Sequence, residues 1–290
     1  MKGDKAMTRG KSVWTAEKYN RFIKEGRGQG EGINYKPFWT ITDFPTYGRA
    51  SRVLGSKTGR IHHFFSDIEK KVFLLLDFDE NNIISDVREH YPLLNIEETI
   101  DTYEDLRLDK FKDKETGEQY VITTTFLITL KDVSGKIRHV AVSVKGSSEL
   151  NRDITIERLE IERRFWEEKN IPWSIITDKE IPKIKCKNIE WIHSTLRNSE
   201  EFGISTDKRT HYKEILKDLL INMYDEIRNI IDYFEKSNNL EQGTGLYIFK
   251  YLIANMDIKV DLNKEIELDK TLKELILDVE GVGYGTAINY

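Results

Sequence analysis

The chain has 290 residues, 39% of them hydrophobic and 33% charged, with a formal net charge of −5. This length can bury one large core or two modest ones, and we expect two domains. No stretch approaches the roughly 18 uninterrupted apolar residues that a membrane span requires, and no export signal follows the basic N-terminus, so we expect a soluble protein of the cytoplasm, without a membrane partner. A single cysteine, Cys186, excludes an intramolecular disulfide framework and any multi-cysteine zinc site.

The charge is unevenly distributed along the chain. Residues 1–60 hold thirteen Lys or Arg residues against five Asp or Glu residues and therefore carry +8, whereas residues 61–290 carry −13. This asymmetry indicates an N-terminal surface that meets an anion on an otherwise acidic protein. The phosphate backbone of a nucleic acid is the obvious candidate.

The first predicted element is a short helix from Thr15 to Glu25, which a glycine-rich stretch ends. The glycines alternate with other residues in a spacing that fits neither a dinucleotide fingerprint nor a phosphate-binding loop, and no apolar strand precedes them. We therefore expect a basic, mobile hinge here. The four glycines are Gly26, Gly28, Gly30 and Gly32.

A basic segment follows, with Tyr47 among its charges, and its composition is that of a DNA-tracking segment. A solvated loop is the alternative interpretation. Its candidate DNA-binding residues are Arg49, Arg52, Lys57 and Arg60. The adjacent His62 and His63 are added to this set as candidate phosphate contacts, although structural packing explains such a pair equally well.

The central part of the chain predicts a mixed α/β sheet. Ser66 and Glu69 form a capping-box pattern ahead of the apolar run VFLLL, which predicts a helix whose cap includes Glu69. Strands are expected within residues 83–94, 120–130 and 139–145, the last two joined by a short polar link that ends at Gly135. A helix over residues 153–169, covered on two sides, and a buried strand over residues 172–177 complete the sheet.

A domain boundary is expected between Asp178 and Pro182, which gives domains of residues 1–180 and 181–290. Apolar residues between Tyr212 and Phe234 recur at three- and four-residue steps and predict one long packed helix. A helix over 246–256, a short strand over 258–262 and a helix over 268–279 follow. This order suits a mainly helical, winged-helix-like domain.

Metal-dependent phosphodiester hydrolysis requires carboxylates that hold magnesium and a cation that stabilises developing charge. Glu69, the strand centred on Thr125, and Lys145 are candidates, and Ser143 shares a strand face with Lys145 because side chains alternate along a strand. Residue types alone leave a non-catalytic alternative open, since a lysine that ends an apolar strand is often only a solvated strand terminus.

Five successive segments span most of residues 25–194. They are EGRGQGEGINYKPF, SKTGRIHHFFSDIEKKVFLLLDF, ISDVREHYPLL, LEIERRFWEEKNIPWSIITDKEI and NIEWIHS. In these segments and in their order, the chain resembles the TnsA endonuclease subunit of heteromeric cut-and-paste transposases. The resemblance implies a restriction-endonuclease-like mixed sheet flanked by helices, and cleavage of the 5′ strands at transposon ends.

Carried over residue by residue, the family's catalytic glutamate falls on Glu69 and its catalytic lysine on Lys145. Its metal-binding aspartate falls on Thr125, and the Gln or acidic position two residues before the lysine falls on Ser143. A neutral hydroxyl is a poor ligand for magnesium or manganese compared with a carboxylate, so metal binding is in doubt. The candidates to compensate are Asp79, Glu89 and Glu162, at positions that resemble acidic family positions, and Glu149 shortly after the lysine.

Two functional hypotheses follow from the resemblance. In the first, the chain is an active nuclease subunit that works with transposon-end DNA, a partner DDE-type (TnsB-like) transposase and a regulatory (TnsC-like) ATPase. In the second, the chain is a catalytically degenerate DNA-binding scaffold for the same partners. An unrelated nuclease-fold DNA-binding or repair protein is a third, which the ordered motifs disfavour.

Overall fold

The computed structural model describes residues 13–43, 49–196 and 204–276. The chain divides into two compact units, Met1–Glu180 and Ile181–Asn289. Across the described ranges, no helix is long and apolar enough to cross a membrane. Each unit is described by itself below.

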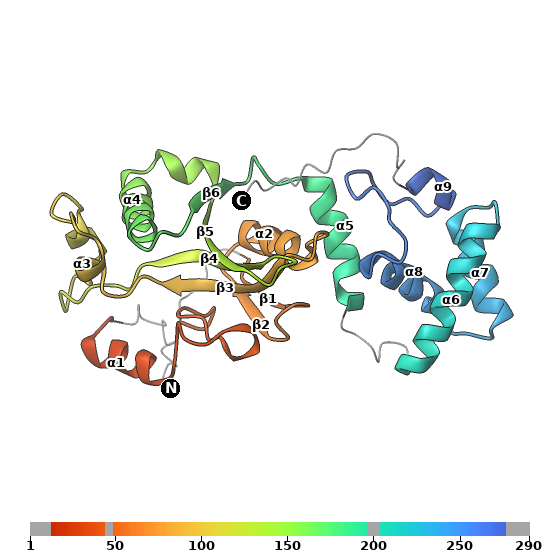
Figure 1. Cartoon of the computed structure of the whole chain (residues 1–290), viewed down its shortest axis with the longest axis horizontal. Coiled ribbons are helices and arrows are strands. Elements are labelled where there is room, and N and C mark those ends of the chain that lie inside the picture. Colours follow the sequence, from red (N-terminus) through yellow and green to blue (C-terminus); the bar gives the residue numbers. More distant parts are fainter. Residues whose placement is uncertain (1–12, 44–48, 197–203, 277–290) are drawn as a thin grey trace, which may run out of the picture. The chain divides into compact units, whose positions relative to one another are not determined.

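The first unit is built on a four-stranded sheet with strand order β3-β4-β5-β6 (Figure 1). The first three strands are antiparallel neighbours, and β6 lies parallel to β5. The parallel pair requires a crossover, which α4 supplies between β5 and β6. The strands are β3 (Ile84–Pro92), β4 (Thr123–Lys131), β5 (Ile137–Lys145) and β6 (Trp173–Thr177).

Helices cover both faces of this sheet. Leu127 and Ala141 belong to one core cluster with Ile161 and Phe165 of α4. Phe126 is the neighbour of Leu127 on β4, and its ring centroid lies 6.2 Å from that of Phe64. The Phe64 ring centroid in turn lies 4.9 Å from that of Phe73 in α2. Since successive strand residues point to opposite faces, α2 and α4 cover opposite sides. These helices are α2 (Asp67–Phe78) and α4 (Asp153–Glu168). A mixed sheet flanked by helices is the predicted restriction-endonuclease-like fold, which is confirmed.

The N-terminal part of the unit packs beside the sheet. The predicted helix forms as α1 (Ala16–Lys24), with Thr15 as its cap, and Trp14 and Phe22 bury 98% or more of their surface in an aromatic cluster. The expected mobile hinge is instead a set of tight turns in which all four glycines have positive φ. A Cβ on Gly28 would lie 2.3 Å from Pro92 Cγ, so only glycine allows this close approach to β3.

The basic segment forms an antiparallel pair, β1 (Ser51–Leu54) and β2 (Ile61–Phe64), and not the solvated loop of the alternative interpretation. Short helical turns occur elsewhere in the unit. They are α3 (Ile96–Thr99) and the 3₁₀ turns η1 (Gly32–Asn34), η2 (Leu108–Phe111) and η3 (Ser147–Asn151).

The second unit is helical in its described part, where β structure is limited to the isolated bridges Glu226↔Thr271 and Val260↔Ile276. The predicted strand over 258–262 is thus reduced to one bridge, and the winged-helix form stays a prediction. The helices are α5 (Lys183–His193), η4 (Ser194–Leu196), α6 (Thr206–Asn222), α7 (Ile227–Ser237), α8 (Thr244–Ala254) and α9 (Leu272–Leu275).

The prediction of one long helix between Tyr212 and Phe234 was wrong. The chain leaves the helical conformation at Met223, whose ψ is 130°, and re-enters it after Glu226, whose ψ is 139°. The Asp225 carboxylate accepts hydrogen bonds from the Glu226 backbone N–H at 2.7 Å and from the Asn229 amide at 2.9 Å, and so fixes the start of α7. Both helices bury apolar residues, which makes the spacing look continuous in the sequence.

Candidate nuclease-like site

Glu69 acts as a helix cap. The Ser66 hydroxyl accepts the Glu69 backbone N–H at 3.2 Å, and the Glu69 carboxylate accepts the Phe65 backbone N–H at 2.7 Å. The predicted cap is therefore formed, with the carboxylate reaching one residue beyond the helix cap itself. One of its two oxygens is committed to holding the first turn of α2.

Thr125 uses its side chain to extend the sheet. The hydrogen-bonded register of β4 and β5 runs to the pair Phe126↔Val142. Beyond this pair, the Thr125 hydroxyl accepts the backbone N–H of Val144 at 3.0 Å. Thr125 is 6% exposed, so its hydroxyl replaces a backbone acceptor in the dry interior.

Ser143 has both hydrogen-bonding functions of its hydroxyl in use. It donates to the Glu162 carboxylate of α4 and accepts from the indole N–H of Trp173 at 2.9 Å. Both Ser143 and Glu162 are fully buried. The contact joins β5, β6 and α4 at one point, which explains why a small hydroxyl residue fits here.

Lys145 ends β5 opposite Thr177 of β6. Burial and the charge of Arg158 lower the pKa of its amine, against the opposing effect of the carboxylates of Glu162, Glu69 and Glu149. The structure therefore brings the two predicted catalytic residues, Glu69 and Lys145, into one electrostatic neighbourhood. Glu149 itself accepts the Gly146 backbone N–H at 2.9 Å.

A second cation, Arg158, acts on the charge of Lys145 and was not among the predicted site residues. Its Nε is 3.3 Å from Glu162 Oε1, and its Nη2 donates to the Thr123 backbone carbonyl at 2.8 Å. Arg158 and Glu162 are four residues apart on α4, a spacing that places side chains side by side. The four-residue spacing could therefore have predicted the pairing of Arg158 with Glu162 from the sequence.

The residues present do not fit a divalent cation. A hard dication prefers carboxylate or carbonyl oxygens, and two of the positions expected to supply them hold hydroxyls that are already hydrogen-bonded. Glu162 Oε1 is buried without a hydrogen-bond partner, but the Arg158 guanidinium faces it. Within the part of the chain that the structure describes, no group of three His, Cys, Asp or Glu side chains is arranged to hold a metal ion.

Asp79, a possible compensating ligand, lies at the other end of α2 from Glu69. Ten residues along a helix correspond to about 15 Å. Its carboxylate accepts the Ile84 backbone N–H at 2.7 Å and lies 3.6 Å from Lys57 Nζ, so it joins α2 to β3. The structure does not bring Asp79 together with Lys145.

Glu89 is the centre of a separate buried network. Arg60 donates to both of its oxygens, and His62 Nδ1 lies 2.8 Å from Oε2. Burial opposes ionisation of Glu89, but His62 and Arg60 hold the pKa of its carboxyl far below the usual value. Arg60 is 8% exposed and His62 is fully buried. Neither side chain is therefore free to make the predicted contact with DNA. In the structure, Arg60 supplies the counter-charge of Glu89 and His62 shares a hydrogen bond with it.

The other candidate DNA-binding residues differ in exposure. Arg49 and Arg52 are exposed. Lys57 is half-buried beside Asp79, and burial is the main cause that lowers the pKa of half-buried His63, which disfavours its charged form. Tyr47 lies outside the described residues.

Comparisons with known proteins give one consistent result. Residues 81–178 match the family model "TnsA-like endonuclease N terminal", and residues 180–262 match "TnsA endonuclease C terminal". The chain is also similar to "Transposon Tn7 transposition protein TnsA" of Escherichia coli. The two are 35% identical over 266 residues, which cover 91% of this chain and 93% of that protein.

Proposed function

Because this chain belongs to the TnsA family of transposon endonuclease subunits, we propose that it serves a heteromeric transposase as a catalytically degenerate, DNA-binding scaffold. Its nuclease fold would hold transposon-end DNA in the cytoplasm, together with a DDE-type (TnsB-like) transposase and a regulatory (TnsC-like) ATPase. In this assignment, residues 1–180 form the endonuclease-like domain and residues 181–290 the partner-binding domain.

The commitment of both hydroxyls is the observation that carries this proposal. Thr125 accepts a backbone N–H, and Ser143 bridges Glu162 and Trp173. Each hydroxyl would have to abandon a buried partner before it could approach an ion, and an unpaired buried polar group costs about 1–3 kcal/mol. The neutral hydroxyl offers little compensation, since it lacks the charge of a carboxylate.

The DNA-binding part of the proposal rests on the exposed arginines at the first strand pair. Arg49 precedes β1 and Arg52 lies within it, and both side chains are open to solvent. Phosphate contacts from such residues are strongly salt-dependent. They orient a duplex without reading its sequence.

A second candidate function is the active endonuclease, which one observation favours. The amine of Lys145 has a lowered pKa and lies among the carboxylates of Glu69, Glu149 and Glu162. A lysine in such a neighbourhood suits the orientation or activation of water. In this alternative, magnesium or manganese would require ligands arranged differently from those described above.

Cleavage of labelled transposon-end DNA separates the two candidates. The reconstituted transposase would be assayed with magnesium and with manganese, using this chain, Lys145→Ala, and Thr125→Asp combined with Ser143→Gln. A scaffold gives no 5′-strand nicking until the double substitution is introduced. Metal-dependent nicking by the unaltered chain that Lys145→Ala abolishes would establish the active endonuclease instead.

The products formed in cells provide an independent readout. If the 5′ strands stay uncut, transposition yields cointegrates, whereas cutting of both strands yields simple insertions. The scaffold proposal therefore expects cointegrates with the unaltered chain. Clean excision that depends on Glu69 and Lys145 would overturn it.

A further inference from the structure

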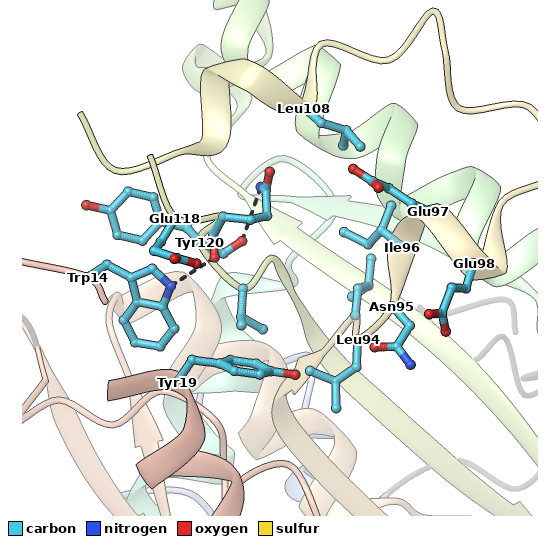
Figure 2. Close-up of a pocket in the computed structure, with 13 residues that line it drawn as sticks. Trp14, Tyr19, Leu94, Asn95, Ile96, Glu97, Glu98, Leu108, Glu118 and Tyr120 are labelled. Carbon is cyan, nitrogen blue, oxygen red and sulfur yellow. Dashed lines mark hydrogen bonds between the residues drawn. The ribbon is translucent and has the colours of Figure 1, made fainter. Parts of the chain in front are cut away.

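A pocket of about 370 Å³ lies in the first unit, and none of its lining residues belongs to the nuclease-like site. Figure 2 shows Trp14, Tyr19, Glu118 and Tyr120 on one side of the pocket and the residues from Leu94 to Glu98 on the other. The first side comes from the N-terminal segment and the approach to β4, and the second from the turn after β3 and the first residues of α3. This volume falls within the range of ordinary ligand pockets.

Trp14 and Tyr120 form an aromatic wall of the pocket, which hydrogen bonds and ring stacking hold in place. The Trp14 indole N–H donates to the Gln119 carbonyl at 2.8 Å, and the Trp14 ring stacks on Tyr120 at 6.2 Å between centroids. The Asp113 carboxylate accepts two hydrogen bonds, one from the Tyr120 hydroxyl at 2.6 Å and one from the Trp14 backbone N–H. A ligand that packs against this wall therefore loses little free energy to rearrangement.

The charged residues that line the pocket are all acidic. Glu97, Glu98 and Glu118 are exposed, and among the described residues none of these carboxylates has a hydrogen-bond or ion-pair partner. Among the residues that the structure describes, no Lys or Arg lines the pocket. The nearby Lys18 amine lies over the Trp14 and Phe22 rings instead, at 5.5 and 5.8 Å.

We propose that this pocket binds an arginine or lysine side chain from a basic segment of a partner protein. The aliphatic stem would lie along Leu94, Ile96 and Val121, and the cationic head would meet the half-buried rings of Tyr19 and Tyr120 and the three carboxylates. Charge complementarity selects this occupant, because the same carboxylates repel DNA phosphates. Arginine is preferred over lysine, since its planar guanidinium stacks on aromatic rings.

This inference extends beyond the proposed function, because it does not depend on whether the nuclease-like site is active. The direct test is a titration of the ¹⁵N-labelled full-length chain with N-acetyl-arginine amide, followed through the Trp14 indole N–H resonance. That resonance is assigned with Trp14→Phe. Saturable shifts in the millimolar range are expected, weaker ones with N-acetyl-lysine amide, and none with the neutral isostere N-acetyl-citrulline amide.

Charge-neutral variants identify the carboxylates responsible. Glu97→Gln, Glu98→Gln and Glu118→Gln in one chain should weaken binding at least about tenfold, about 1.4 kcal/mol. The matched control removes three exposed carboxylates that do not line the pocket, through Asp101→Asn, Glu104→Gln and Glu241→Gln. This control should bind the arginine probe as the unaltered chain does.

Three results would overturn the proposal. Equal shifts with the arginine and citrulline probes would show that the cation is not recognised. Equal loss of binding in the control would show a response to overall charge alone. A saturable response to N-acetyl-leucine amide but not to N-acetyl-arginine amide would identify an apolar docking site. In each case the nicking assay still reports independently on the nuclease-like site.

Discussion

Ser143 donates its hydroxyl hydrogen to the carboxylate of Glu162, and thereby links the end of β5 to the middle of α4. Both residues are fully buried. Both residues were predicted as candidate metal-ligand positions from the resemblance to the TnsA family. Here the contact satisfies a buried carboxylate and is part of the core.

Removal of the Ser143 hydroxyl should therefore reduce stability. Ser143→Ala leaves a Glu162 oxygen and the Trp173 indole N–H without their buried partner, which should cost about 1–3 kcal/mol of unfolding free energy. Urea denaturation measures this loss. The control Ser174→Ala, at an exposed position on neighbouring β6, should change stability by less than about 0.5 kcal/mol. Equal effects of the two substitutions would contradict the assigned contact.

The network around Glu89 predicts a pH-dependent stability. The folded-state pKa of this carboxyl lies below the unfolded value of about 4.3, so its contribution is fully present above that value and is lost as pH falls through the folded pKa. Glu89→Gln should cost about 3–5 kcal/mol at pH 7, because it leaves Arg60 buried without its counter-charge.

The same substitution should cost progressively less below about pH 4, where Glu89 in the unfolded state of the unaltered chain becomes protonated. Thermal unfolding of both proteins between pH 3 and 7 gives the measurement. A cost that stays constant across this range would mean that Glu89 is not the titrating group.

Two substitutions of Glu69 distinguish its role as a helix cap from a role in catalysis. Glu69→Gln keeps an oxygen that can accept the Phe65 N–H, whereas Glu69→Ala removes it and should cost about 1 kcal/mol. In the scaffold proposal, Glu69→Gln leaves both stability and transposition products unchanged. Loss of activity in Glu69→Gln with unchanged stability would favour the active endonuclease.

Metal binding should be absent from the unaltered chain and gained by restoration of ligands. Calorimetric titration with manganese should show no saturable binding at this site, and Thr125→Asp with Ser143→Gln should introduce it. Arg158→Ala added to that pair should strengthen it further, because the guanidinium now faces Glu162. Saturable binding by the unaltered chain that Thr125→Val abolishes would contradict the geometry described here.

Local patterns predicted much of the sheet and its helices correctly. The capping box at Ser66, the strand around Val87, the polar link ending at Gly135 and the helix before Trp173 all depend on residues close together in sequence. The long helix through Met223 was wrong because apolar spacing reports burial, and two successive helices against one core keep nearly the same spacing.

The sequence by itself determined the family, the mixed α/β fold and the replacement of two expected metal ligands by Thr125 and Ser143. Only the tertiary structure decided what those hydroxyls do, and that Arg60 and His62 bind Glu89 in the protein interior. Glu89 is 29 residues from Arg60, and Ser143 is 19 from Glu162. Hydrogen bonds and charge pairs over such separations depend on how strands and helices are packed, and residue spacing carries no information about that packing.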